Sequence, residues 1–245
     1  MKLARIELHK MKRTRVWSVA VVVAAAVSAV CAVPSATSAH GDEAWRGLML
    51  GYAGMCALVS PLFTAILASR QTDMEHGANG WNLYGSAGYR LSALLTSKLS
   101  IGAVLLALTV SAQTVAVVSS GIAQGLGAGL DGAMWSGYAV RLWAVDMAFL
   151  SFHLIVAATV RNQLVVLGLG TIGSFTSFYS LLAPADLLVL KFFPPAYFAQ
   201  ITPLVGLPDG FVEVDVPDLW VGAFLAASFT VFLTFSWKGF ERVQS

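Results

Sequence analysis

The feature that most constrains the fold is a series of long stretches without a charged residue. Uncharged runs cover residues 16–39, 47–69, 99–130, 162–185 and 219–237, and the run 142–160 is interrupted only by one aspartate and one histidine. A membrane-spanning helix needs about 20 mostly apolar residues. The chain is 57% hydrophobic and only 11% charged, whereas soluble domains carry about 25% charged residues. The sequence therefore excludes an ordinary water-soluble enzyme and predicts a membrane protein.

These runs predict an all-α membrane protein with six transmembrane helices in a single domain, residues 1–245. The run 99–130 is too long for one span, and its glycine-rich tail from Gly121 favours the exit of the helix. We therefore place the spans near 16–35, 47–69, 99–120, 140–160, 163–183 and 218–237. The first run could also be a signal peptide with small residues at 35–39 as its cleavage site. Its apolar part is longer than is usual for a signal peptide, which favours an uncleaved span.

The basic residues predict the orientation, since they accumulate on the cytoplasmic side of membrane proteins. With the N-terminus inside, twelve lie in the cytoplasm: Lys2, Arg5, Lys10, Lys12, Arg13, Arg15, Arg70, Arg90, Lys98, Arg161, Lys238 and Arg242. Three lie outside: Arg46, Arg141 and Lys191. The opposite orientation would invert this ratio. We expect both termini to be cytoplasmic in a multi-pass protein of the plasma membrane.

Two segments beside the spans have patterns of their own. In residues 1–15, Met1, Ala4, Leu8 and Met11 share one helical stripe beside a basic stripe, which favours an interfacial helix at the inner headgroup layer over a disordered basic tail. Residues 184–217 hold six of the eight prolines together with apolar runs. Because this density of proline forbids one straight helix, we expect short broken helices that dip into the outer leaflet.

The longest predicted cytoplasmic stretch is residues 70–98. It is too short for a folded domain, yet it carries many aromatic and charged side chains: Asp73, Glu75, His76, Trp81, Tyr84, Tyr89 and Arg90. Such a mixture fits a short helix and loop that dock onto a soluble partner. It also fits an interfacial loop whose aromatic rings lie among lipid headgroups. Composition alone leaves both interpretations open.

The motifs that could carry enzyme chemistry are weak or missing. Gly168, Gly170 and Gly173 match G-x-G-x-x-G, but this signature of nucleotide binding needs a soluble βαβ unit. Within a span, the three glycines indicate close helix packing. The sequence contains no P-loop motif, no H-E-x-x-H and no C-x-x-C, so we expect no metal site and no ATP hydrolysis by this chain. An intramembrane hydrolase or haem protein lacks the residue pairs it needs.

Asp146 and His153 are the ionisable residues predicted within the spans. They are seven residues apart and share one helix face about 10 Å apart. A buried carboxylate costs roughly 2.5–3.5 kcal/mol on insertion scales, so both residues should face the bundle. One interpretation is a proton path or a polar contact on a substrate route. The interpretation we favour is structural: Asp146 pairs with Arg141 or a hydroxyl, and His153 hydrogen-bonds to a neighbouring helix.

Taken in order, these weak signals resemble the permease subunits of type-2 ABC exporters, in particular the group with the lantibiotic-immunity and multidrug permeases. Residues 6–12 resemble the E-x-x-K-x-K helix before the first span of the family, and residues 70–98 resemble its cytoplasmic coupling segment. Residues 160–170 resemble its tight inner turn before a glycine-containing fifth span. The Phe193-Pro194-Pro195 stretch resembles its broken outer helices, and residues 240–242 its charged exit.

The resemblance implies a non-catalytic permease that pairs with an identical or homologous permease. Two ATP-binding cassette subunits would attach from the cytoplasm and would bind ATP and Mg²⁺, with no cofactor in this chain. It favours the docking interpretation, with Asp73, Glu75, Trp81, Tyr84 and Arg90 as coupling contacts. The function implied is export of an amphipathic or hydrophobic substrate, such as a bacteriocin-like or lantibiotic-like peptide or a drug, from a bacterial cell. The alternative is a self-contained secondary transporter or channel with Asp146 on the transport path.

Overall fold

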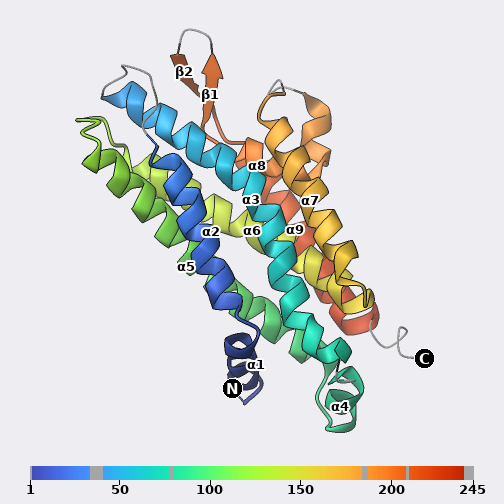
Figure 1. The fold of residues 1–245 in the computed structure, drawn as a ribbon. Coiled ribbons are helices and arrows are strands. Elements are labelled where there is room, and N and C mark those ends of the chain that lie inside the picture. The colour runs from blue at the N-terminus through green and yellow to red at the C-terminus, as the bar shows by residue number, and fades with distance from the viewer. Residues whose placement is uncertain (1, 34–40, 78–79, 184–186, 208–209, 240–245) are drawn as a thin grey trace.

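The computed structural model describes residues 2–33, 41–77, 80–183, 187–207 and 210–239. Helices dominate it and run side by side in an elongated bundle (Figure 1). The long helices are α2 (Val16–Cys31), α3 (Asp42–Gly77), α5 (Leu91–Ala123), α6 (Gly132–Thr159), α7 (Gln163–Ser180) and α9 (Asp218–Thr234). The short ones are α1 (Lys2–Arg13), α4 (Gly80–Ser86), η1 (Leu188–Phe192), η2 (Pro194–Ala196), α8 (Tyr197–Gln200) and the π-helical η3 (Phe235–Gly239).

Four of the described helices, α3, α5, α6 and α9, are long and apolar enough to cross a membrane. The apolar α2 has 16 residues, and α7 has 18, so the count of six spans remains a prediction. The helical content and these four apolar helices support the predicted class, a multi-pass helical membrane protein.

Three of the long helices, α3, α5 and α6, extend past the predicted spans, whereas α2 and α7 lie within them. α3 runs from Asp42 to Gly77, and α6 begins at Gly132 rather than near residue 140. Asp131 caps α6, because its carboxylate accepts hydrogen bonds from the backbone N–H groups of Ala133 (2.9 Å) and Met134 (3.1 Å). A lack of charge marks the part of a helix that can lie in lipid, whereas the helix itself ends where its backbone groups are capped. The predicted bounds therefore describe the uncharged parts of these helices, and where the chain enters and leaves the bilayer stays a prediction.

α3 lies at the centre of the bundle and packs most extensively against α7 and α6. One hydrophobic cluster surrounds it near α1, with Leu94 and Leu154 fully buried. The other cluster lies toward the opposite end and is rich in aromatic rings, with Tyr52 stacked on Trp135 at 5.9 Å between centroids. These two clusters fix the long helices along most of their length.

The two ends of the bundle differ in structure. α1 and α4 lie at one end, here called the α4 end, and α8 with the hairpin lies at the other, the hairpin end (Figure 1). The hairpin pairs β1 (Leu204–Leu207) antiparallel with β2 (Gly210–Glu213), and it is the only sheet in the part of the chain that the structure describes. In the predicted orientation the α4 end is cytoplasmic.

Three sequence predictions need comment at these ends. Residues 2–13 form the predicted helix α1, and of its apolar stripe Met11 is buried while Leu8 is exposed, so the lipid-facing role of the stripe stays a prediction. Residues 187–200 form the short helices η1, η2 and α8, but the sequence did not predict the hairpin that follows them. The side chains of Met1 and Ala4, the possible cleavage site at 35–39 and the charged exit at 240–242 lie outside the described residues.

Candidate functional site

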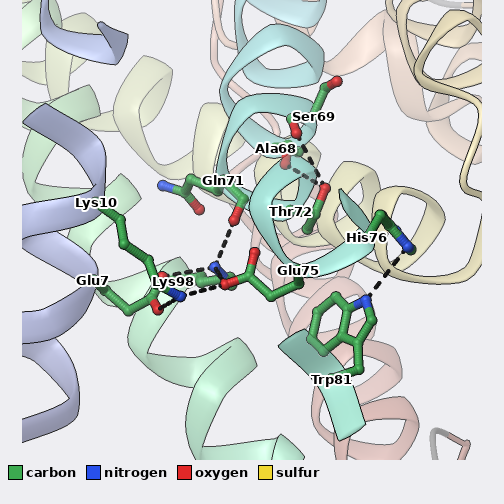
Figure 2. A network of polar contacts seen from close by, with 10 residues as sticks. All are labelled: Glu7, Lys10, Ala68, Ser69, Gln71, Thr72, Glu75, His76, Trp81 and Lys98. Atoms are coloured by element: carbon green, nitrogen blue, oxygen red, sulfur yellow. Dashed lines mark hydrogen bonds and ion pairs between the residues drawn. The ribbon is translucent and has the colours of Figure 1, made fainter. Parts of the chain in front are cut away.

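Two of the residues predicted to couple to a partner, Glu75 and Trp81, lie where α3 ends and α4 begins (Figure 2). Trp81 of α4 donates its indole N–H to Nδ1 of His76 at 3.4 Å. His76 must then carry its proton on Nε2, which lies 2.7 Å from the carbonyl oxygen of Ala157 in α6. This chain of hydrogen bonds ties α4 to α3 and α3 to α6. A displacement of α4 would therefore also act on the long helices α3 and α6.

Four charged side chains form a buried cluster beside this chain (Figure 2), here called the ion cluster: Glu7, Lys10, Glu75 and Lys98. Nζ of Lys98 lies 2.6 Å from Oε2 of Glu7 and 2.9 Å from Oε1 of Glu75, and it donates to the carbonyl of Gln71 at 2.5 Å. Nζ of Lys10 lies 2.9 Å from Oε1 of Glu7 and 2.6 Å from Oε1 of Glu75. The cluster links α1, α3 and α5.

The environment of Lys10 keeps its ammonium group charged. Burial alone would lower the pKa of Lys10, but its interactions with Glu75, Tyr84 and Glu7 outweigh burial and raise the pKa above the ordinary value for lysine. The ammonium nitrogen lies 4.7 Å from the ring centroid of Tyr84 in α4, within the range of a cation–π contact. Lys10 therefore joins α1 to α4 as well as to α3.

The five predicted coupling residues differ in accessibility. Arg90 is exposed and Tyr84 is half-buried, whereas Glu75 and Trp81 are buried. Asp73 is exposed and accepts a hydrogen bond from the side-chain amide of Gln163 at the start of α7. Glu75 and Trp81 thus contribute to the interior of the segment, whereas Asp73 and Arg90 lie on its surface.

Sequence reasoning missed several residues of this site. One of them is Leu83 on α4, which is 66% exposed. In the sequence, Glu7 is part of the stretch that resembles the entry helix of the family. Lys98 is part of the charge balance and of the stretch that resembles the coupling segment. Nothing there indicates that both belong to the ion cluster. The i,i+3 spacing of Glu7 and Lys10 is a signal for an ion pair. No sequence spacing links residue 7 to residue 98.

Within the bundle, the two ionisable residues of α6 both lie against α3. Asp146 is buried and lines a small cavity together with Ser60 of α3, while its Oδ1 has no hydrogen-bond partner among the described residues. The predicted partner Arg141 instead pairs with Asp218 of α9 at 3.1 Å. Nδ1 of His153 lies 3.1 Å from the hydroxyl of Thr64 in α3. Both residues thus join α6 to α3.

Of the three glycines predicted to serve helix packing in α7, two pack closely against α3 and one does not. A Cβ added at Gly170 would lie 2.5 Å from Cβ of Ala65, and one at Gly173 would lie 3.2 Å from Cβ of Pro61, both on α3. A Cβ at Gly168 would meet nothing within 4 Å. The prediction that Gly168 serves helix packing is therefore wrong, because this glycine faces away from α3.

A cavity of about 650 Å³ lies at the hairpin end. It is lined by residues of α3, the end of α7, α8 and the hairpin, and its walls are mostly apolar, including Leu50, Phe178 and Leu181. Lys191 and Asp215 also line it. Among the described residues, no group of three or more histidine, cysteine or acidic side chains could hold a metal ion.

The described chain is thus a bundle of apolar helices with the short helix α4 at one end and a mostly apolar cavity at the other. The family model for the ABC-2 family transporter protein matches residues 3–182. The chain therefore belongs to the ABC-2 transporter family, whose members are membrane components that associate with an ATP-binding cassette subunit. A comparison with curated proteins finds no match to the chain.

Proposed function

We propose that this protein is the permease subunit of an ATP-driven exporter and that its α4 end docks onto a separate ATPase. The observation that carries the proposal is the position of α4, which projects from the bundle with Leu83 exposed (Figure 1). Tyr89 and Arg90 are exposed in the turn that follows. An apolar side chain beside an aromatic ring and an arginine is the composition of an interface centre.

The proposed mechanism is a shift between two populations of the bundle. ATP binding closes the ATPase subunits, and their movement displaces α4. Trp81 and His76 pass the displacement to α3 and α6, since both are hydrogen-bonded along this path. α3 in turn carries α7, because Gly170 and Gly173 pack closely on it. This chain binds no ATP or Mg²⁺ in the mechanism, and the ATPase supplies both.

The cavity at the hairpin end supports an amphipathic or hydrophobic substrate. Its mostly apolar walls suit an apolar body, and Lys191 and Asp215 can meet polar groups near its margin. We infer a toxic compound such as a lantibiotic-like peptide, exported by two permeases, identical or homologous, in the bacterial plasma membrane. The excess of basic residues in the segments at the α4 end supports a cytoplasmic location of that end and of both termini.

Reconstitution in lipid vesicles tests the proposal against its alternative. Export from vesicles should require both the ATPase and ATP, and the purified permease alone should transport nothing. Transport by the permease alone, driven by an ion gradient and abolished in Asp146→Asn at unchanged abundance, would instead establish a secondary transporter that uses Asp146.

A further inference from the structure

The ion cluster is the one place in the described structure where four oppositely charged side chains meet in the interior. The side chains of Lys98 and Glu75 are fully buried and that of Glu7 is 4% exposed, while that of Lys10 is 20% exposed. The negative charges of the two carboxylates balance the positive charges of the two ammonium groups. Buried charges persist only when they are paired and hydrogen-bonded, so each member depends on the positions of the others.

The ion cluster provides much of the contact that holds α1 in position. Met11 is buried on α1, whereas Ile6 and Leu8 are exposed, so the helix has few apolar anchors. α1 is also a separate body from α2: Arg15 between them has φ 55° and ψ 26°, the left-handed conformation that breaks a continuous helix. Short charged contacts hold α1 at a defined position, and small changes of distance alter them strongly.

α1 contacts α4 and the long helices through the same side chains. Lys10 binds Glu75 of α3 and lies against Tyr84 of α4, while Glu7 binds Lys98 of α5. One acceptor remains spare, because Oε2 of Glu75 is buried without a hydrogen-bond partner among the described residues. The four side chains thus connect α1 with α3, α4 and α5 at one point.

We propose that α1 belongs to the coupling machinery and that Glu7 and Lys98 are its positioning residues. When the ATPase displaces α4, Tyr84 and Glu75 carry Lys10 with them, and α1 moves as one unit with α4. The ion cluster then passes the movement to α5 through Lys98 and to α2 through the break at Arg15. This inference rests on the proposed function, and it adds a second path beside the one through His76.

Coupling measurements in vesicles that hold the permease with its ATPase test the role of the cluster. Glu7→Gln should keep the bound ATPase and its basal ATP hydrolysis but lower transport per ATP by roughly tenfold, a usual size of coupling between sites. Arg13→Gln is the matched control, because Arg13 lies on the same helix but is exposed, and it should leave this ratio unchanged. Lys10→Gln at the rim of the cluster gives a second measurement if Glu7→Gln does not accumulate.

A distance measurement separates coupling from a merely structural role. Spin labels at two exposed positions, Leu8 of α1 and Ser86 of α4, are introduced after Cys31 and Cys56 are replaced by alanine. In the wild-type complex, the distance between labels should be the same with and without ATP, and Glu7→Gln should make it change with ATP. If wild-type permease binds no ATPase, the proposed function fails. If wild-type couples and both Glu7→Gln and Lys10→Gln couple equally well, the role of the ion cluster is refuted.

Discussion

Gly170 is the position at which the close packing of α7 on α3 can be tested most sharply. In Gly170→Ala, the added Cβ would lie 2.5 Å from Cβ of Ala65, 3.1 Å from the carbonyl oxygen of Pro61 and 3.2 Å from Cα of Leu62. None of these atoms is the end of a flexible side chain, so α7 must move away from α3. Overpacking of this kind costs about 1–3 kcal/mol.

Gly168→Ala is the matched control on the same helix, because its added Cβ meets nothing within 4 Å. Both variants gain about 1 kcal/mol of helix propensity, so the difference between them isolates the contact. We expect Gly170→Ala to be less stable than Gly168→Ala by about 1–3 kcal/mol. The free energy of unfolding in mixed micelles, measured by titration with sodium dodecyl sulfate, gives this difference. Equal stability of the two variants would refute the close contact between α7 and α3.

Two further predictions concern polar contacts of α6. Thr64→Val removes the hydroxyl 3.1 Å from Nδ1 of His153 and should lower the free energy of unfolding by about 1–3 kcal/mol. Thr64→Ser keeps a hydroxyl and should retain most of the stability of the wild type. Equal stability of the two variants would show that this hydrogen bond does not stabilise the contact between α6 and α3. Arg141→Gln breaks the exposed pair with Asp218 and should cost less than about 1 kcal/mol in the same assay. A larger loss would mean that this pair is more shielded from water than its exposure indicates.

The sequence predicts the membrane class and sets residues 70–98 apart from the spans, because both depend on composition along the chain. Long uncharged runs mark the apolar parts of helices, and the mixture of aromatic and charged residues in 70–98 marks a segment outside them. The sequence does not predict where the helices end, because a cap such as Asp131 depends on local backbone geometry. The hairpin after α8 is equally local and has no alternating pattern long enough to be recognised.

The internal arrangement of the site could not be predicted for a different reason. Glu75 looks like a charge on a solvated loop, and only the fold places it against Lys98 and Lys10. Likewise, Gly168 and Gly170 are indistinguishable in the sequence, and only the rotation of α7 decides which of them faces α3. Contacts between residues far apart in the chain need the three-dimensional structure.

The central claim, that α4 docks onto an ATPase, is tested most directly by co-purification of the tagged permease with its ATP-binding cassette subunit. Leu83→Asp places a charge on the exposed face of α4, and Leu207→Asp places the same charge on the hairpin, where the leucine is 53% exposed. We predict that wild type and Leu207→Asp retain the ATPase, while Leu83→Asp loses it at unchanged permease abundance. Retention of the ATPase by Leu83→Asp, or no bound ATPase in the wild type, would contradict the docking role of α4.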